Sequence, residues 1–250
     1  MRDRSSSPLL DAFAVSEHLT PLPELKQAGL VQIDLDGHLE PPLKYHEDVR
    51  LGCGGQTWPA GLLLAKHMLR YHRSQLEHHD AILELGAGGG LVGLAVALGC
   101  AGKSKVLLTD QDEMVGLARH NIRLNGLESR VTALVLNWGE ALPHAVVQQR
   151  PSIILAAECV YFEPAFPLLM QTLKDLLALN AEAVVYFCFK KRRRADLHFV
   201  KAARKSFIVD ELFDHDRPGF ARQALHLFSL RGKEAATAKN ATINRDAVAS

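Results

Sequence analysis

The chain has 250 residues, of which 48% are hydrophobic and 23% are charged, and its formal net charge is +1. This composition is that of a globular protein with an ample core, and the balanced charge gives no global field for nucleic acid or membranes. The four cysteines are scattered without a CxxC pair, which excludes a disulfide framework or a zinc pattern and suits a reducing compartment.

The first part of the chain, residues 1–45, is expected to form an N-terminal arm and a hairpin. No apolar segment typical of a signal peptide lies near its start. The alternating stretch 31–43 predicts the hairpin, with its turn around Asp36-Gly37. After the hairpin, the apolar spacing of 57–73 predicts a helix with Pro59 in its first turn.

From residue 81 onward the sequence alternates between strand and helix patterns. Strands are expected at 81–86, 105–110, 130–138, 152–158, 183–190, 206–215 and 224–232. Helices are expected from the end of the first strand to about 101, at 113–126 and at 164–179. The pattern predicts an α/β fold: a Rossmann-like, seven-stranded, mostly parallel sheet with helices on both faces and a C-terminal antiparallel hairpin.

This domain is expected to span 46–231, and the polar, Ala-rich tail at 232–250 is expected to be disordered. The uncharged stretch 85–102 reaches the length of a membrane span. Seven of its 18 residues are glycine, so a strand, a loop and a helix explain it better.

The glycine loop after the first strand of the alternating region points to a nucleoside cofactor. Glu84 is followed by Gly86, Gly88 and Gly90 in an ExGxGxG pattern. The dinucleotide pattern GxGxxG fits only from Gly88, so NAD stays an alternative at this point. Asp110 ends the next strand, about 20 residues further on, where a ribose diol is held in such folds.

Two later strands end in residues that suit a ligand site, because ligands bind beyond the carboxyl ends of parallel strands. Trp138 is placed to pack on an adenine, and the alternative is a core tryptophan. Glu158 and Tyr161 follow a strand that adjoins the first in such folds, so we expect them on the substrate side. The alternative for Glu158 is an exposed carboxylate that caps the helix at Pro164.

From about residue 50 to 230 the chain resembles the family-16 seven-β-strand methyltransferases, a group of protein-lysine methyltransferases. The matching segments are Gln56-Thr57-Trp58-Pro59-Ala60, Asn121-Ile122-Arg123-Leu124-Asn125, Asn137-Trp138-Gly139 and Glu158-Cys159-Val160-Tyr161. Most members carry Asp where this chain has Glu158. The chain is most similar to the fungal enzymes that methylate a lysine of translation elongation factor 1A.

The resemblance implies S-adenosylmethionine as the cofactor and a protein, expected to be elongation factor 1A, as the substrate. It places cofactor contacts at Trp58, Gly86, Ala87, Gly88, Asp110, Trp138 and Ala157. It makes Glu158 and Tyr161 the catalytic, substrate-side residues. We expect a cytoplasmic monomer without a metal, without direct contact to nucleic acid and without membrane attachment.

Three other functions stay open at this point: methylation of a small molecule or nucleic acid, a non-catalytic cofactor-binding module, and a nicotinamide dehydrogenase. The basic run 190–194 predicts a solvated loop, with docking of an acidic partner or RNA phosphates as the alternative. His78-His79-Asp80 lacks a third ligand at a useful spacing and predicts a surface turn in place of a metal site.

Overall fold

The computed structural model describes residues 28–78, 81–100, 102 and 104–233. Most of the expected N-terminal arm, nearly all of the expected disordered tail, and two of the three residues in the predicted turn at 78–80 lie outside these ranges. The strands are β1 (Gly29–Ile33), β2 (Leu43–Glu47), β3 (Ala81–Leu85), β4 (Lys105–Asp110), β5 (Val131–Val135), β6 (Ile153–Ala157), β7 (Val184–Lys190), β8 (Phe207–Glu211) and β9 (Leu225–Gly232). The α-helices are α1 (Pro59–Tyr71), α2 (Arg73–His78), α3 (Leu91–Gly99), α4 (Asp112–Leu124), α5 (His144–Gln149), α6 (Phe166–Leu179), α7 (Arg194–Ser206) and α8 (Arg217–Arg222), and the 3-10 helices are η2 (Val49–Gly55) and η3 (Glu163–Ala165).

Seven strands form one sheet in the order β5-β4-β3-β6-β7-β9-β8, and β1 and β2 form a separate hairpin. The pairs from β5 to β7 are parallel. Strand β9 lies between β7 and β8 and is antiparallel to both. The α/β fold with a mostly parallel sheet and a C-terminal antiparallel hairpin is therefore confirmed.

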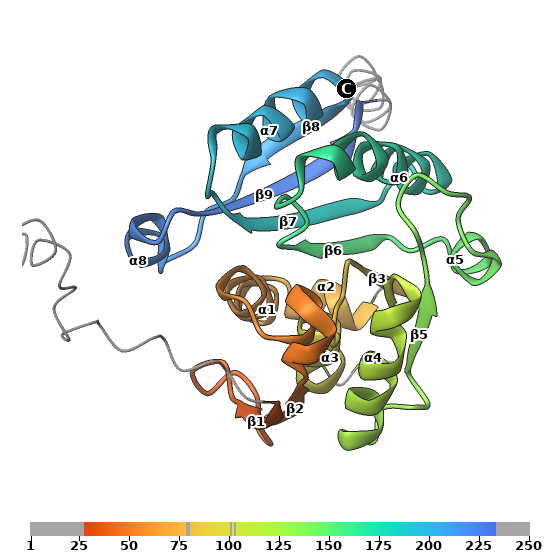
Figure 1. Cartoon of the computed structure of the whole chain (residues 1–250), viewed down its shortest axis with the longest axis vertical. Coiled ribbons are helices and arrows are strands. Elements are labelled where there is room, and N and C mark those ends of the chain that lie inside the picture. Colours follow the sequence, from red (N-terminus) through yellow and green to blue (C-terminus); the bar gives the residue numbers. More distant parts are fainter. Residues whose placement is uncertain (1–27, 79–80, 101, 103, 234–250) are drawn as a thin grey trace, which may run out of the picture.

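Successive residues of the central strands enter two different cores, because side chains of a strand alternate between the faces of its sheet. In β3, Ile82 belongs to the core under α1, α3 and α4, whereas Leu83 belongs to the core under α5, α6 and α7. Figure 1 shows α1, α3 and α4 on one side of the sheet and α6 and α7 on the other. This double burial explains why the central strands are continuous apolar runs.

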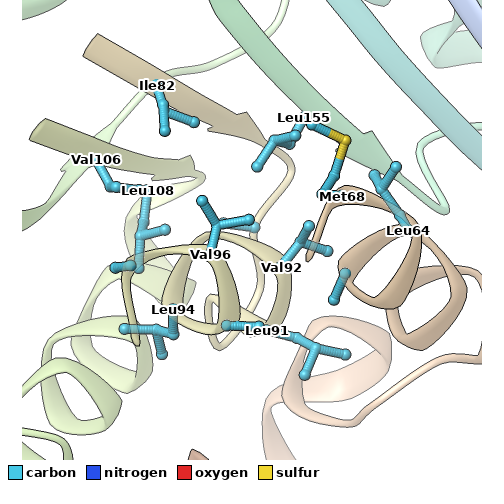
Figure 2. Close-up of a cluster of buried hydrophobic side chains, with 14 of the residues drawn as sticks. Leu64, Met68, Ile82, Leu91, Val92, Leu94, Val96, Val106, Leu108 and Leu155 are labelled. Carbon is cyan, nitrogen blue, oxygen red and sulfur yellow. The ribbon is translucent and has the colours of Figure 1, made fainter. Parts of the chain in front are cut away.

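In the first core, α3 packs beside α1, and both helices contact the same face of the sheet (Figure 2). Val92 and Val96 of α3 belong to one cluster with Leu155 of β6 and Met68 of α1, and all four side chains are almost fully buried. Burial of each such side chain contributes about 1.5–3 kcal/mol. The packing fixes the N-terminus of α3, which follows the glycine loop directly.

The hairpin is joined to the same core by a buried amide. Leu43 and Tyr45 of β2 are fully buried. Asn121 of α4 accepts a hydrogen bond from the His46 backbone N–H at 2.8 Å and donates to the His46 carbonyl at 3.2 Å. Its Nδ2 also donates to the carbonyl of Gly89 at 3.0 Å. One side chain thus holds the hairpin against the glycine loop.

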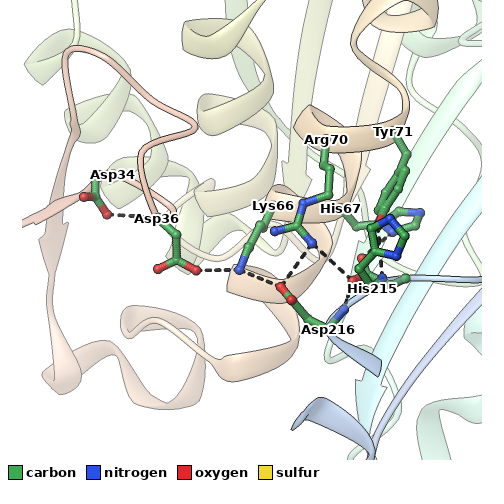
Figure 3. Close-up of polar contacts among 9 residues, drawn as sticks. Asp34, Asp36, Lys66, His67, Arg70, Tyr71, His215 and Asp216 are labelled. Atoms are coloured by element: carbon green, nitrogen blue, oxygen red, sulfur yellow. Dashed lines mark hydrogen bonds and ion pairs between the residues drawn. The ribbon is translucent and has the colours of Figure 1, made fainter. Parts of the chain in front are cut away.

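A polar network on α1 joins the hairpin loop to the segment before α8 (Figure 3). The Lys66 ammonium lies 2.5 Å from Asp36 and 2.6 Å from Asp216. Beneath them, His67 Nδ1 lies 2.8 Å from Asp214, and both side chains are 2% exposed. Burial lowers the pKa of His67 and so favours a neutral ring. Exposed ion pairs contribute little to stability, so the buried hydrogen bond between His67 and Asp214 is the main polar contact that holds the segment before α8 to α1.

The structure departs from the sequence expectations in the hairpin loop and in several helices. The hairpin is present, but Ile33 pairs with Leu43, so the loop spans 34–42 and is wider than a turn at Asp36-Gly37. Helix α7 was not predicted, because the charged residues at its start hid a buried face of Asp196, Phe199, Val200 and Ala203 with helical spacing. The short helices α2, α5 and α8 were also not predicted.

Within the part of the chain that the structure describes, no helix combines the length and the apolar character that crossing a bilayer requires.

Replacement of Asn121 by alanine is expected to lower the free energy of unfolding by about 2–3 kcal/mol, because the buried carbonyl of Gly89 and the partly buried backbone groups of His46 lose their partner. The matched control is Asn125→Ala. Asn125 bonds the same strand at Lys44, one helical turn further on and nearer to water. It should cost about 1 kcal/mol or less. Urea unfolding measures both, and equal losses would contradict the role of Asn121.

Candidate active site

A cavity of about 890 Å³ lies at the carboxyl ends of β3, β4 and β6. The glycine loop, η2, the start of α4 and the segments after β5, β6 and β7 line it. The nine residues that the sequence singled out all lie in its wall: Trp58, Gly86, Ala87, Gly88, Asp110, Trp138, Ala157, Glu158 and Tyr161. The structure brings them together, and their individual roles stay predictions.

The glycine loop approaches η2 so closely that one position has no room for a side chain. Gly88 has a φ of +54°, and a Cβ atom there would lie 2.5 Å from the carbonyl oxygen of Gly54. Both the left-handed backbone and the close contact require glycine. The backbone of the loop is therefore exposed to the cavity, where a ligand can contact it directly.

Asp110 at the end of β4 fixes this loop from the side. Its Oδ2 accepts a hydrogen bond from the Gly88 N–H at 2.7 Å, and its Oδ1 accepts one from the Gln111 N–H at 2.7 Å. Burial raises the pKa of Asp110, and the two N–H groups oppose that change. The carboxylate thus lies beside the glycine backbone, where the sequence placed the acceptor for a ribose.

Glu84 has a structural role that the sequence pattern alone did not reveal. It is 3% exposed and accepts hydrogen bonds from the N–H groups of Val92 at 3.2 Å and Gly93 at 2.7 Å. These are free N–H groups of the first turn of α3. Burial raises the pKa of Glu84 to about 8, although the two N–H groups favour the ionised form. Glu84 therefore ties β3 to the helix across the loop.

Glu158 lies directly after β6 with a φ of +56°, in the left-handed region that non-glycine residues rarely adopt. Its side chain is 10% exposed, and its Oε2 lies 2.7 Å from Nη1 of Arg192. Its Oε1 is buried and has no hydrogen-bond partner among the described residues. The alternative of an exposed helix cap is wrong, because the carboxylate turns toward Arg192 and the cavity.

Arg192 is the functional candidate that the sequence reasoning missed. Its guanidinium lies over the ring of Trp58, 5.3 Å from the centroid, and that indole donates to the carbonyl of Cys53 at 2.7 Å. Arg192 is exposed, like Lys191 and Arg194, as the predicted solvated run requires, but its guanidinium also forms part of the cavity wall beside Glu158. No local signal marks Arg192, because its partner Glu158 lies 34 positions away.

Aromatic residues form the rim and one wall of the cavity. Tyr161 is 53% exposed and Phe162 is 56% exposed, next to Glu158. Partial burial raises the pKa of the Tyr161 phenol. Trp138 packs against the core under α6 and also lines the cavity. Its surroundings therefore suit both sequence interpretations, a core tryptophan and a residue placed to pack on an adenine.

The described residues hold no group of three or more His, Cys, Asp or Glu side chains that suits a metal ion. All four cysteines are free: Cys53 is exposed, whereas Cys100, Cys159 and Cys188 are buried. The Cys159 thiol donates to the Leu85 carbonyl at 3.3 Å and packs beside the glycine loop.

Comparison with known proteins yields one family and several relatives. A family model described as "Lysine methyltransferase" matches residues 38–206. The chain is 36% identical over 233 residues to the protein-lysine N-methyltransferase EFM6 of Saccharomyces cerevisiae, covering 85% of this chain and 94% of that protein. It is 31% identical over 147 residues to the EEF1A lysine methyltransferase 3 of Mus musculus, covering 57% of this chain and 58% of that protein.

Among solved structures, the chain resembles the N,N-8-amino-8-demethyl-D-riboflavin dimethyltransferase RosA of Streptomyces davawensis. The TM-score is 0.50 at 14% identity, over 69% of this chain and 55% of that one. At this identity the likeness concerns the fold alone, and it agrees with the Rossmann-like sheet described above.

The Gly88→Ala variant is expected to bind S-adenosylmethionine at least about tenfold more weakly, because a left-handed alanine costs about 1–3 kcal/mol and its Cβ displaces the loop. Gly116→Ala on α4 is the control, since no atom lies within 4 Å of the Cβ it would gain. Calorimetric titration measures both affinities. Unchanged binding by the Gly88 variant would contradict the assignment of the loop.

Glu84 is expected to make the protein less stable as the pH rises. Its pKa rises from 4.5 to about 8 on folding, so between these values the folded state binds more protons than the unfolded state. The contribution of Glu84 to the free energy of unfolding is therefore complete below pH 4.5, and it is lost as the pH rises toward about 8. Glu84→Gln should reduce the fall in unfolding free energy between about pH 5 and pH 8, as followed by urea unfolding.

The control for this experiment is Glu128→Gln, which changes an exposed carboxylate and should keep the pH dependence of the wild type. The same pH dependence in the wild type and the Glu84 variant would show that Glu84 has no raised pKa.

Proposed function

Because the chain belongs to the lysine methyltransferase family, we propose that it methylates a lysine of translation elongation factor 1A, with Glu158 and Tyr161 at the substrate amine. The chain is an S-adenosylmethionine-dependent protein-lysine methyltransferase.

The wall of the cavity fits the cofactor. Gly88 leaves its backbone open to a ligand, and Asp110 presents a partly buried carboxylate beside it. Trp58 and Trp138 contribute aromatic rings to the cavity wall. The small residues Gly86, Ala87 and Ala157 leave space in the cavity for the cofactor. Together these features support cofactor contacts at the seven predicted positions.

The observation that carries the catalytic proposal is the unpartnered Oε1 of Glu158 in the wall of this cavity. An unpaired buried carboxylate oxygen is costly unless a ligand supplies a donor. A lysine side chain supplies that donor, and the backbone of Glu158 adopts a rare conformation of the kind that clusters at active sites.

Bound S-adenosylmethionine would supply a methyl group on a sulfonium sulfur; the amine lone pair would form the new nitrogen–carbon bond as the carbon–sulfur bond breaks and leaves its electron pair on sulfur. Glu158 accepts a hydrogen bond from the amine and so orients its lone pair. Tyr161 lies at the rim, where its ring guides the aliphatic part of the lysine toward Glu158. Alignment of the two reactants is the main contribution of the chain.

The relative whose name includes EEF1A supports elongation factor 1A as the substrate. The resemblance of the segment 157–162, Ala-Glu-Cys-Val-Tyr-Phe, and of the C-terminal strands to the corresponding fungal enzymes supports it as well. A protein substrate also suits the exposed aromatic rim of Tyr161 and Phe162, because exposed apolar patches beside a cavity mark interaction sites. The proposal includes a cytoplasmic location and a monomeric enzyme.

Radiolabelled S-adenosylmethionine and an extract from a strain lacking this gene test the proposal. Wild-type protein should label a protease-sensitive band at the mass of elongation factor 1A, and mass spectrometry should find a methylated lysine in it. Glu158→Gln should lower kcat about 100-fold through lost alignment, with cofactor affinity near that of the wild type.

The matched control is Glu163→Gln, an exposed carboxylate outside the cavity wall, which should label like the wild type. Full turnover by the Glu158 variant would reject the catalytic assignment. Label in a different protein would reject elongation factor 1A, and nuclease-sensitive label would reject a protein substrate.

A further inference from the structure

We propose that Arg192 is a positioning residue of this methyltransferase: it holds one oxygen of Glu158, leaves the other for the substrate amine, and favours the uncharged form of that amine. The inference rests on the proposed function of Glu158. It starts from the asymmetry of the carboxylate, whose Oε2 lies 2.7 Å from Arg192 while Oε1 has no partner among the described residues.

Neighbouring groups hold both the backbone and the guanidinium of Arg192. The buried carboxylate of Asp196 accepts a hydrogen bond from the Arg192 backbone N–H at 2.7 Å. The guanidinium also donates to the carbonyl of Lys190 at 3.3 Å and lies over the ring of Trp58. Because its position is fixed before a ligand arrives, the plane of the Glu158 carboxylate is fixed as well.

Arg192 is the one basic residue in the cavity wall that the structure describes. The titratable groups that face the same space are Tyr45 of β2, Cys53 of η2, Glu84 of β3, Asp110 of β4, Glu113 of α4, Glu140 after β5, and Cys159 and Tyr161 after β6. Behind Glu158, the backbone carbonyl of Cys188 in β7 accepts a hydrogen bond from the Glu158 N–H at 2.9 Å. The acidic members of this set attract a cation, and Arg192 alone opposes them.

This charge balance decides the protonation of the amine. A lysine amine with a pKa near 10.4 is mostly an ammonium at neutral pH and then has no lone pair to give. A lone Glu158 would stabilise that ammonium, whereas a neighbouring guanidinium destabilises it. Beside the Glu158–Arg192 pair the amine loses one proton to solvent, donates a remaining N–H to Oε1 and keeps its lone pair for methyl transfer.

The first test is the pH dependence of kcat, which reports ionisations in the enzyme–substrate complex. The enzymes are the wild type, Arg192→Met, Arg192→Lys and the control Lys191→Met, which removes an exposed positive charge one residue away. The substrate is elongation factor 1A purified from a strain lacking this gene.

For Arg192→Met, the rising limb of the pH profile of kcat should move to higher pH by about one unit, because no guanidinium then destabilises the ammonium form of the substrate lysine. Near pH 7 this corresponds to about a tenfold fall in kcat, recovered at alkaline pH. Arg192→Lys keeps the charge and should keep the limb near its wild-type position, as should Lys191→Met. A limb that stays in place or moves to lower pH in Arg192→Met would overturn the inference.

A binding measurement decides the matter even if Arg192→Met does not turn over. In the presence of S-adenosylhomocysteine, elongation factor 1A should bind this variant about tenfold more tightly than the wild-type enzyme at pH 7, since Glu158 then has no other cation. Elongation factor 1A with the target lysine replaced by methionine should bind both enzymes equally. Weaker or unchanged binding of the lysine form would also overturn the inference.

The two proposals fail in different ways. If the wild type methylates no lysine of elongation factor 1A, the proposed substrate is wrong, and the same comparison is repeated with whichever protein becomes labelled. If the wild type is active and Arg192→Met behaves like Lys191→Met in both measurements, only the role of Arg192 is wrong.

Discussion

The site depends on one constraint of the sheet, the reversal of strand order between β3 and β6. These two strands are parallel neighbours, but the chain leaves β3 toward α3 on one face and leaves β6 toward α6 on the other. The two connections diverge, and a crevice remains between them at the carboxyl ends of the strands. Glycines line one side of this crevice and Glu158 lies on the other, so neighbouring strands bring cofactor and substrate groups together.

Buried polar groups make this crevice rigid. Asn121 holds the hairpin to the glycine loop, and Glu84 ties the same loop to the first turn of α3. Asp110 supports it from the next strand. Each group gains hydrogen bonds that offset the cost of its burial. Glu158 differs, because only one of its oxygens is satisfied within the described structure. Polar groups with hydrogen-bond partners thus surround one oxygen, Oε1 of Glu158, that has none in the described chain, and this arrangement is expected where a ligand must bind.

The sequence predicted what depends on neighbours along the chain. The strands, the glycine loop and the segment from Glu158 to Tyr161 carry local patterns, and the fold follows from their alternation. Contacts between distant segments carry no such pattern. The pairing of Arg192 with Glu158 and the bonds from Asn121 to His46 join segments that become neighbours only when the sheet forms. Helix α7 was missed because its sequence begins within the basic run 190–194, which obscures the helical spacing of its buried residues.

The uneven burial of the four thiols gives the protein a built-in chemical reporter. Cys53 is exposed and lines the cavity beside Trp58, whereas burial raises the pKa of the Cys100 thiol to about 11 and those of Cys159 and Cys188 well above their usual range. Because the thiolate is the reactive form, an alkylating reagent attacks Cys53 in the native protein and reaches the other three only after unfolding. The count of fast-reacting thiols therefore separates a variant with a damaged site from one with a damaged fold, and a fluorophore on Cys53 lies where it can report the arrival of ligands.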